Sequence, residues 1–353
     1  YSFKTGNGAP EEKALAVVNH EVAVRLVIDW LRSQPNLRAI DAVGHRVVHG
    51  ADRFADSVLI DDAVIVELEG LCEIAPLHNP GAVSGIRAAR KILGDAVPMV
   101  AAFDTSFHHM IPEQAALYAI PYELSQKHKI RRYGFHGLAH RYDVGRYAEL
   151  IGKPVAQVNA VTLHLGNGCS ATAIRDGQSI DTSMGFTPLE GLVMGTRSGD
   201  VDPALVSYLA RKEQVDAAEV ENWLNKRSGL LGLSGLSNDM RELTAAYHTH
   251  PRARLAIDVF CYRARKYLGA YLAVLEGRAE AVIFSGGIGE NSPLVRKNIL
   301  GGMEWCGLTL DDAGNESVIG RDGRISTAQS NLAVFVIHTD EETVIARETA
   351  RLV

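Results

Sequence analysis

The stretch Val161-Thr-Leu-His-Leu-Gly-Asn-Gly-Cys-Ser-Ala-Thr-Ala-Ile174 predicts a β-hairpin in the middle of the chain. Its first five residues alternate between apolar and polar, as in a half-buried strand. Gly166-Asn-Gly168 then forms the turn, and residues 171–174 return as the second strand. The hairpin opens the second half of the chain with strands joined by a glycine-rich turn.

Before this hairpin, the pattern alternates between helix and strand. In residues 11–31, apolar side chains recur at spacings of three and four, which predicts an amphipathic helix; they are Leu15, Val18, Val22, Leu26 and Trp30. Strands are expected over residues 39–48 and 97–103. Between them, Asn79 is the expected N-cap and Pro80 the first residue of a helix that runs to Leu93.

After the hairpin, the same alternation continues. Asp202-Pro203 and Ser292-Pro293 each start a helix, residues 252–275 form a long helix, and 281–285 and 331–337 form strands. Thr339 and Glu342 are spaced as a capping box for a final helix through Leu352. Alternating strands and helices predict an α/β fold.

Composition limits the classes of protein. The 353 residues are 46% hydrophobic and 22% charged, which fits a globular protein of two domains with a sizeable core. The net charge of −6 argues against a nucleic-acid or membrane-surface binder, since those need basic patches. Four scattered cysteines predict buried thiols in a reducing compartment, and the sequence contains no apolar run of membrane-spanning length.

Two glycine-rich segments follow strands, at residues 164–168 and 286–291. Glycine lets backbone N–H groups approach phosphate oxygens. A glycine-rich turn after a strand, however, more often contacts no ligand. Neither has the Walker A spacing or the dinucleotide fingerprint.

Two arginines are more informative. Arg46 lies in Gly44-His-Arg-Val-Val-His-Gly50 and Arg197 in Met194-Gly-Thr-Arg-Ser-Gly-Asp200, stretches with several glycines and few acids. The usual arginine is salt-bridged on the surface. These two are expected to be unpaired and to bind a carboxylate or a phosphate.

Histidines cluster in the first half of the sequence, at positions 45, 49, 78, 108, 109 and 136, without the spacing of a metal site. Most are expected to be structural. His136 differs because glycines flank it, and Asp104 closes an apolar strand, where α/β proteins place ligands. The plainer alternative for Asp104 is an N-cap.

Ten segments in order resemble the acetate kinase family. They are residues 44–50, 75–80, 103–108, 131–137, 164–168, 184–191, 194–200, 239–241, 284–292 and 339–342. The resemblance implies an actin-like fold of two related, ribonuclease H-like domains with a nucleotide cleft between them. We expect these domains to be residues 1–104 plus 342–353, and residues 105–341.

The resemblance also implies a function and a site. The implied reaction is reversible, Mg²⁺-assisted transfer of phosphate from ATP to acetate, by a cytoplasmic homodimer with no covalent cofactor; Mn²⁺ is an alternative metal. The implied catalytic residues are Asp104, His136 and Arg197. The implied acyl-binding residues are Arg46, Val48, Leu77, Phe135 and Pro188. The implied nucleotide-binding residues are His164, Leu165, Gly166, Asn167, Gly168, Asp239, Met240, Arg241, Gly287, Ile288, Gly289, Glu290 and Asn291, with Glu341 at the metal.

Three features depart from the family pattern. The opening hairpin, with a phosphate-binding Lys and a Mg²⁺-associated Asn, is expected upstream of Tyr1, so a polypeptide starting there is expected to be weakly active and to aggregate. Asp340 stands where many relatives have Asn, and Cys169 follows the phosphate turn in place of a small residue.

Several alternatives remain open at this point. Bulky Val48 favours acetate over propionate or butyrate, a difference of about 1–3 kcal/mol per methylene. A non-catalytic nucleotide-binding relative is disfavoured by the intact set Arg46, Asp104, His136 and Arg197. A sugar kinase would need a polar pocket. Since a carboxylic acid is already ionised near neutral pH, Asp104 is expected to position groups and to bind Mg²⁺-bound water rather than to remove a proton.

Overall fold

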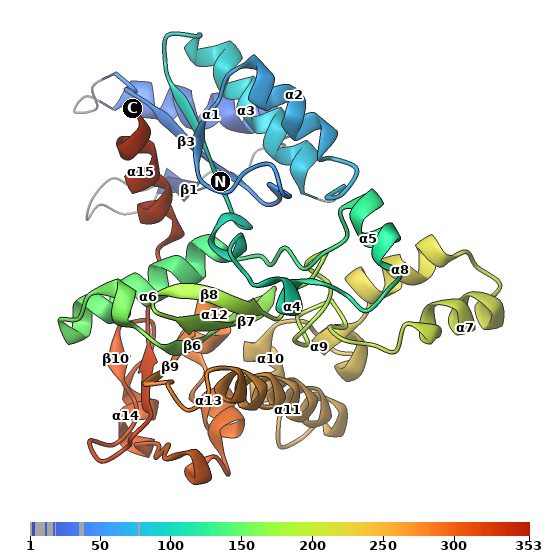
Figure 1. Cartoon of the computed structure of the whole chain (residues 1–353), viewed down its shortest axis with the longest axis vertical. Coiled ribbons are helices and arrows are strands. Elements are labelled where there is room, and N and C mark those ends of the chain that lie inside the picture. Colours follow the sequence, from blue (N-terminus) through green and yellow to red (C-terminus); the bar gives the residue numbers. More distant parts are fainter. Residues whose placement is uncertain (1, 4–10, 13–16, 18, 35–38, 77) are drawn as a thin grey trace.

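The computed structural model describes residues 2–3, 11–12, 17, 19–34, 39–76 and 78–353 (Figure 1). Its helices and strands form two lobes, each built on its own sheet, with a further short pairing of β1 (Ser2–Phe3) with β2 (Glu11–Glu12). This mixed α/β architecture is the predicted fold class.

The smaller lobe contains a three-stranded sheet in the order β3-β5-β4. Strands β3 (Val43–Val47) and β5 (Met99–Phe103) are parallel, and β4 (Val58–Leu59) is antiparallel to β5. Ala101 and Phe103 pack into the cluster formed with α2 (Asp62–Gly70) and α3 (Asn79–Leu93), and α1 (His20–Ser33) lies on α3. Ala102 faces the other way, as alternation along a strand requires.

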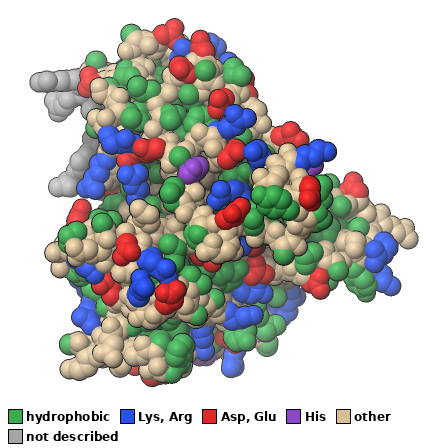
Figure 2. Space-filling view, in the orientation of Figure 1, with side chains coloured by type: hydrophobic (Ala, Val, Ile, Leu, Met, Phe, Trp, Pro, Cys, Tyr) green, Lys and Arg blue, Asp and Glu red, His purple; other side chains and the backbone are tan. Residues whose placement is uncertain are grey.

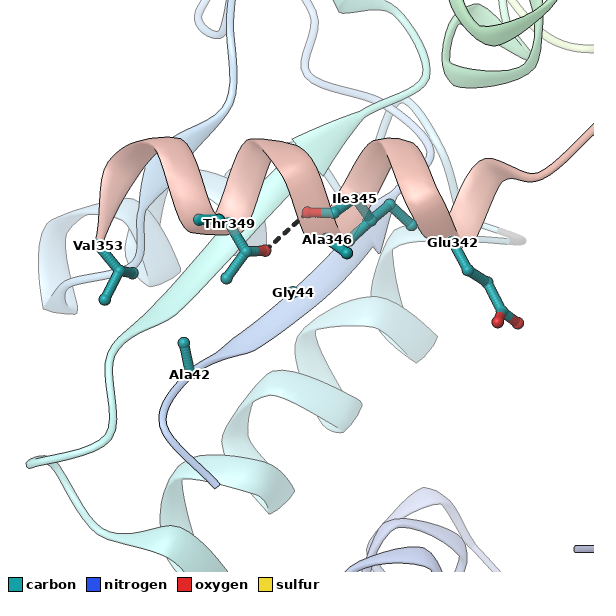
Figure 3. Close-up of a pocket in the computed structure, with 8 residues that line it drawn as sticks. Ala42, Gly44, Glu342, Ile345, Ala346, Thr349 and Val353 are labelled. Atoms are coloured by element: carbon teal, nitrogen blue, oxygen red, sulfur yellow. Dashed lines mark hydrogen bonds between the residues drawn. The ribbon is translucent and has the colours of Figure 1, made fainter. Parts of the chain in front are cut away.

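Helix α15 (Glu341–Leu352) covers that other face of the small sheet. Figure 3 shows Ile345 and Thr349 of α15 over Gly44 of β3, where a Cβ atom would collide with both side chains. Gly44 is therefore required by the close approach of helix and strand. A groove of about 580 Å³ runs along this junction.

The larger lobe contains a six-stranded sheet in the order β10-β11-β9-β6-β7-β8. The strands are β6 (Ala160–Leu165), β7 (Cys169–Arg175), β8 (Gln178–Thr182), β9 (Ala281–Ser285), β10 (Gly323–Arg324) and β11 (Ala333–Val336). β6, β9 and β11 are parallel, whereas β6–β7–β8 is an antiparallel meander, which confirms the predicted hairpin.

The long helix α11 (Pro251–Val274) packs on one face of this sheet and contributes to the largest apolar cluster. Helix α6 (Gly137–Ile151) packs on the opposite face through Val144, Tyr147 and Ala148. Its first turn also reaches the small sheet, because Leu138 packs with Ala102 and Val344. Helix α6 therefore contacts both lobes.

The remaining helices are shorter. They are η1 (Ser106–His108), α4 (Glu113–Ala116), α5 (Tyr122–His128), η2 (Val155–Gln157), α7 (Ala204–Glu213), α8 (Ala217–Lys226), α9 (Gly229–Ser234), α10 (Met240–Ala245), α12 (Gly286–Asn291), α13 (Pro293–Leu300), η3 (Glu304–Cys306) and α14 (Asp312–Ser317). Helices α7 and α8 form an arm that projects from the larger lobe in Figure 1. In the part of the chain that the structure describes, no helix combines the length and apolarity needed to cross a membrane.

Two predictions at the N-terminal side need correction. The first helix begins at His20 rather than near residue 11, because the Asn19 side chain accepts a hydrogen bond from the Val22 N–H and so caps it; Leu15 and Val18 lie outside the described residues. Asn79 is the first residue of α3 and does not cap it. Its side chain instead bonds the backbone N–H and C=O of His49.

Two further predictions fail near the C-terminus. Residues 286–291 form helix α12 rather than a turn. Thr339 does not cap α15: Asp340 accepts from the Thr343 N–H, and the Thr339 hydroxyl donates to Asp143. A short carboxylate directly before the helix competes better for the free N–H groups.

Candidate active site

Arg46 and Asp104 meet at the carboxyl ends of the parallel strands β3 and β5. Nε and Nη2 of Arg46 donate to the two carboxylate oxygens of Asp104 at 2.9 and 2.7 Å, and Nη1 lies 3.1 Å from Glu341. Burial alone would lower the pKa of Arg46, but the hydrogen bond and charge of Asp104 outweigh it and the pKa rises. The expectation that Arg46 is unpaired is therefore wrong, because its acids come from distant positions in the sequence.

The charge of Asp104 also acts on Glu341. Burial raises the pKa of Glu341, Arg46 opposes this, and the charge of Asp104 adds to the rise. The described residues hold no group of three or more His, Cys, Asp or Glu placed to bind a metal. Mg²⁺, however, is commonly held by only one or two carboxylates together with phosphates and water. The two carboxylates on Arg46 suit that chemistry.

Arg197 has the opposite environment. Its Nη1 donates to the Pro188 carbonyl oxygen at 2.6 Å, and within the described ranges it forms no ion pair. Burial lowers the pKa of its guanidinium. The prediction that Arg197 has no acidic partner is confirmed for the described residues, and a half-buried cation of this kind suits an anion.

Gly168 brings Arg197 and His136 together. A Cβ atom on Gly168 would lie 2.7 Å from Nη2 of Arg197 and 3.2 Å from Nε2 of His136. The turn between β6 and β7 therefore presents backbone at the point where these two side chains converge. A side chain at position 168 would crowd the His136 ring and displace the end of Arg197, so glycine at this position keeps both side chains close to the turn.

His136 immediately precedes α6 and has φ = 57°, in the left-handed region. Its imidazole lies 5.0 Å from that of His164. Burial and the positive surroundings, including Arg46 and Arg197, hold the pKa of His136 well below its usual value. Burial and Arg46 lower the pKa of His164 to about 4. Both rings are neutral near pH 7.

The predicted acyl-binding side chains are only partly accounted for. Val48 packs against the apolar cluster that contains Phe135, and Pro188 holds Arg197 through its carbonyl group. His49 lies edge-on to Phe135, with ring centroids 5.3 Å apart. Leu77 lies outside the described residues.

A cavity of about 1090 Å³ opens beside the β6–β7 turn. It contains eight of the predicted nucleotide-binding residues: Gly166, Asn167, Asp239, Met240, Arg241, Gly287, Ile288 and Asn291. Sequence reasoning missed the others that line it, namely Asn238, Thr244, Ala245, Ser292, Pro293, Leu294 and Glu316. His164, Leu165, Gly168, Gly289 and Glu290 do not line it.

Some of these predicted residues support the cavity from behind. Leu165 belongs to the apolar core, and buried Glu290 bonds His338 and the Thr339 N–H. The fully buried Arg296 donates to the carbonyl oxygens of Gly289 and Glu290, and also to Asn315 and Val318. Since α12 ends at these carbonyl groups, Arg296 fixes the helix that borders the cavity.

Other polar residues at the site carry no sequence signal of their own. Asp143 is buried and accepts hydrogen bonds from Ser285 and Thr339, and Ser285 in turn contacts His164 at 3.0 Å. Burial raises the pKa of Asp143 to about 7. The pKa of His78 is lowered by burial and by Arg197 and Arg46, so it too lies near the arginines. His78 belongs to the histidines grouped in the sequence and to the family-like segment 75–80, but it was not predicted as a site residue.

Charged side chains of both signs are distributed over the surface. Basic and acidic side chains are interspersed over the face seen in Figure 2. Local pairing rather than an overall field therefore governs this face, and any anion must be captured by specific side chains such as Arg197.

A model of the Acetokinase family matches residues 1–347. The chain is 52% identical to the acetate kinase of Chloroherpeton thalassium, with 100% of this chain and 88% of that protein covered, and 52% identical to that of Solibacter usitatus (98% and 86% covered). The crystal structure of Porphyromonas gingivalis acetate kinase superimposes with a TM-score of 0.93 at 40% identity (99% and 89% covered). A propionate kinase from Francisella tularensis gives a TM-score of 0.89 at 42% identity (94% and 85% covered).

Proposed function

This chain belongs to the acetokinase family, and from that premise we propose that it is an acetate kinase. It transfers the γ-phosphoryl group of ATP to the carboxylate of acetate, reversibly, to give acetyl phosphate and ADP. The observation that carries the proposal is that Arg197, which forms no ion pair with a described residue, converges with His136 on Gly168 beside the large cavity. We further propose that residues 1–104 plus 342–353 and residues 105–341 are its two domains.

ATP occupies the cavity between the β6–β7 turn, α10 and α12, with its phosphates toward Gly166–Gly168. Acetate lies near Val48 and Phe135, with Arg46 facing its carboxylate. Arg197 then neutralises the phosphoryl group in transfer, and His136 donates a hydrogen bond to it. Phosphoryl transfer requires this alignment and charge neutralisation more than covalent chemistry.

Asp104 acts through Arg46 rather than as a base. Acetate is already ionised near neutral pH and has no proton to lose. The two hydrogen bonds from Arg46 to Asp104 orient the guanidinium instead. The remaining N–H groups of Nη1 and Nη2 stay available for substrate oxygens.

Glu341 and Asp104 are the residues that would hold Mg²⁺ or Mn²⁺, directly or through water. When bound, the metal would neutralise charge on the nucleotide phosphates. The carboxylates then have two competing cations, so metal binding and the orientation of Arg46 are linked.

A propionate kinase is the second candidate, favoured by the similarity to the Francisella tularensis enzyme. Val48 argues for acetate because its branched side chain limits the acyl pocket. By analogy with the family, we propose a cytoplasmic homodimer that binds neither nucleic acid nor membrane.

The deciding experiment measures acyl phosphate with hydroxylamine in the presence of ATP, Mg²⁺ and a panel of acetate, propionate and butyrate. We expect the highest kcat/KM for acetate and a lower, measurable value for propionate. The proposal fails if no carboxylate yields a hydroxamate, and the second candidate replaces it if propionate is preferred.

A further inference from the structure

A line of buried polar side chains runs behind His136 into the larger sheet. Nδ1 of His136 lies 2.9 Å from the Ser170 hydroxyl, and that hydroxyl lies 2.7 Å from Nε2 of His140. Nδ1 of His140 lies 2.7 Å from the Thr162 hydroxyl. Ser170, His140 and Thr162 come from β7, α6 and β6, and all three are fully buried.

The number of protons available gives this row of hydrogen bonds a direction. A hydroxyl has one proton to donate, and a neutral imidazole carries one N–H. Burial holds the pKa of both His136 and His140 well below the usual value, so both rings are neutral. Each contact in the chain therefore has one donor and one acceptor, and choosing the donor at one end fixes all the others.

Thr162 makes that choice. Its hydroxyl has two possible acceptors, Nδ1 of His140 at 2.7 Å and the Thr172 carbonyl oxygen at 3.5 Å. If His140 donated to Thr162 instead, the proton of the buried Thr162 hydroxyl would have only the 3.5 Å contact, which is at the limit of a hydrogen bond, and a poorly satisfied buried donor is costly. Thr162 therefore donates to His140, His140 donates from Nε2 to Ser170, and Ser170 donates to Nδ1 of His136.

We propose that Thr162, His140 and Ser170 form a one-directional hydrogen-bonded chain that keeps the proton of His136 on Nε2 and makes this ring a neutral donor toward the transferring group. The functional part of this inference rests on the proposed kinase activity. The Cε1–Nε2 edge of the His136 ring faces Gly168, where Arg197 also converges. Ser170 and His140 are then positioning residues, since they act through His136.

A neutral donor suits this location. A protonated imidazole would be repelled by the nearby guanidinium groups of Arg46 and Arg197, which lower the pKa of His136. A neutral ring that always presents N–H can contact phosphoryl oxygens without that penalty. It remains a donor throughout the pH range above its depressed pKa.

The neighbouring His164 has the opposite orientation. When the Asp143 carboxylate is ionised, Ser285 donates its proton to it and accepts from Nδ1 of His164. Nε2 of His164 is then left without a proton while the ring is neutral. Of these two adjacent imidazoles, His136 alone presents an Nε2–H while Asp143 is ionised.

The direct test is nuclear magnetic resonance of the unmodified protein labelled with ¹⁵N-histidine. Long-range ¹H–¹⁵N correlation spectra near pH 7.5 separate the two neutral tautomers and the protonated ring, and His136→Gln and His140→Gln variants assign the signals. We expect His136 and His140 to be neutral with the proton on Nε2. A proton on Nδ1 of His136, or a doubly protonated ring, would overturn the inference whether or not the protein is a kinase.

Matched variants test the functional part. Ser170→Ala should lower kcat for acyl phosphate formation about tenfold or more, because His136 loses the bond that orients it, while the KM for ATP changes less than twofold. Thr162→Val should lower kcat two- to fivefold and alter the ¹⁵N shift of Nδ1 of His140. Thr172→Val is the control: Thr172 pairs with Thr162 across the strands and is equally buried, but its hydroxyl contacts Thr182.

The outcomes separate this inference from the proposed function. If wild-type protein forms no acyl phosphate, the proposed function fails and the tautomer measurement still decides the direction of the chain. If wild-type is active and folded Ser170→Ala keeps its kcat within twofold, the positioning roles are overturned. An equal loss in Thr172→Val would also overturn them, since it would reveal a general packing effect.

Discussion

Arg46 and Arg197 reach the same site from the two lobes, yet they are held in opposite ways. Arg46 has two carboxylates on its guanidinium, whereas among the described residues Arg197 contacts a backbone carbonyl oxygen and no carboxylate. Arg46 is therefore oriented before any ligand arrives, and Arg197 keeps its charge for the ligand. Arg46 is held in a fixed orientation, and Arg197 offers a positive charge that no carboxylate neutralises.

The largest effect should come from removing the unneutralised charge. Arg197→Ala is expected to lower kcat about a thousandfold, because its charge is needed where negative charge accumulates in transfer. Nucleotide affinity, measured by calorimetry with ADP, should stay nearly constant. Arg197→Lys is the matched control and should recover part of the rate. An unchanged kcat in Arg197→Ala would mean that the anion site lies elsewhere.

Asp104→Asn should have the next largest effect, since it removes the charge that orients Arg46 but keeps the size of the side chain. We expect kcat to fall about 10- to 100-fold and half-maximal activation to require more Mg²⁺. A magnesium titration at saturating acetate and ATP measures both. Near-normal turnover with unchanged magnesium dependence would remove Asp104 from both proposed roles.

The two arginines should also differ in their contribution to folding. Arg46→Ala leaves Asp104, only 1% exposed, without its partner and should lower the free energy of unfolding by about 1–2 kcal/mol, a value reduced for the partial exposure of Arg46. Arg197→Ala removes a cation that forms no ion pair with any described residue, and it should change the free energy of unfolding by less than about 0.5 kcal/mol. Urea unfolding of both variants compares them. An equal loss of unfolding free energy in the two variants would contradict the difference proposed between Arg46 and Arg197.

A smaller effect concerns the apolar neighbour of Arg46. Val48→Ala should raise the ratio of kcat/KM for propionate to that for acetate about three- to tenfold, because the acyl pocket widens. Val66→Ala, at a valine that is 65% exposed on α2, serves as the control and should leave the ratio unchanged. If the ratio stays constant in Val48→Ala as well, then Val48 does not line the pocket.

The smallest effect is stabilisation by an anion. Inorganic phosphate at ten times its Kd should stabilise the folded protein by about 1.4 kcal/mol and raise Tm by roughly 2–3 °C. Arg197→Ala should abolish most of this shift in a thermal melt, and Arg46→Ala should retain more of it. The reverse order would mean that Arg46 is the stronger anion-binding group.

Local patterns in the sequence predicted much of the fold and part of this contrast. Strand and helix periodicity predicted the hairpin of β6 and β7, β9, and most of α3 and α11, and the scarcity of acids near Arg197 correctly predicted an unpaired guanidinium. The same reasoning failed at Arg46. Its partners are 58 positions downstream and at position 341, and only the parallel pairing of β3 with β5 brings the first of them close.

Errors at helix ends have a similar origin. Thr339 and Glu342 have the spacing of a capping box. The Thr339 hydroxyl, however, donates to buried Asp143, and Asp340 caps the helix by accepting from the Thr343 N–H. The chain of Thr162, His140 and Ser170 was equally hidden, because its members come from two strands and a helix. Competition among partners that meet only after folding is not encoded in the spacing of any one segment.

The space over Gly44 affects how closely the Glu341 carboxylate approaches Arg46. The space over this residue lets α15 rest on β3 (Figure 3). Helix α15 begins at Glu341, which supplies the second carboxylate on Arg46. A methyl group at position 44 would push against α15 and tilt it. Glu341, at the start of α15, would then move away from the guanidinium of Arg46, which lies two residues after Gly44 on β3. A purely steric change at a position that carries no functional group would then be felt as the loss of one negative charge beside Arg46.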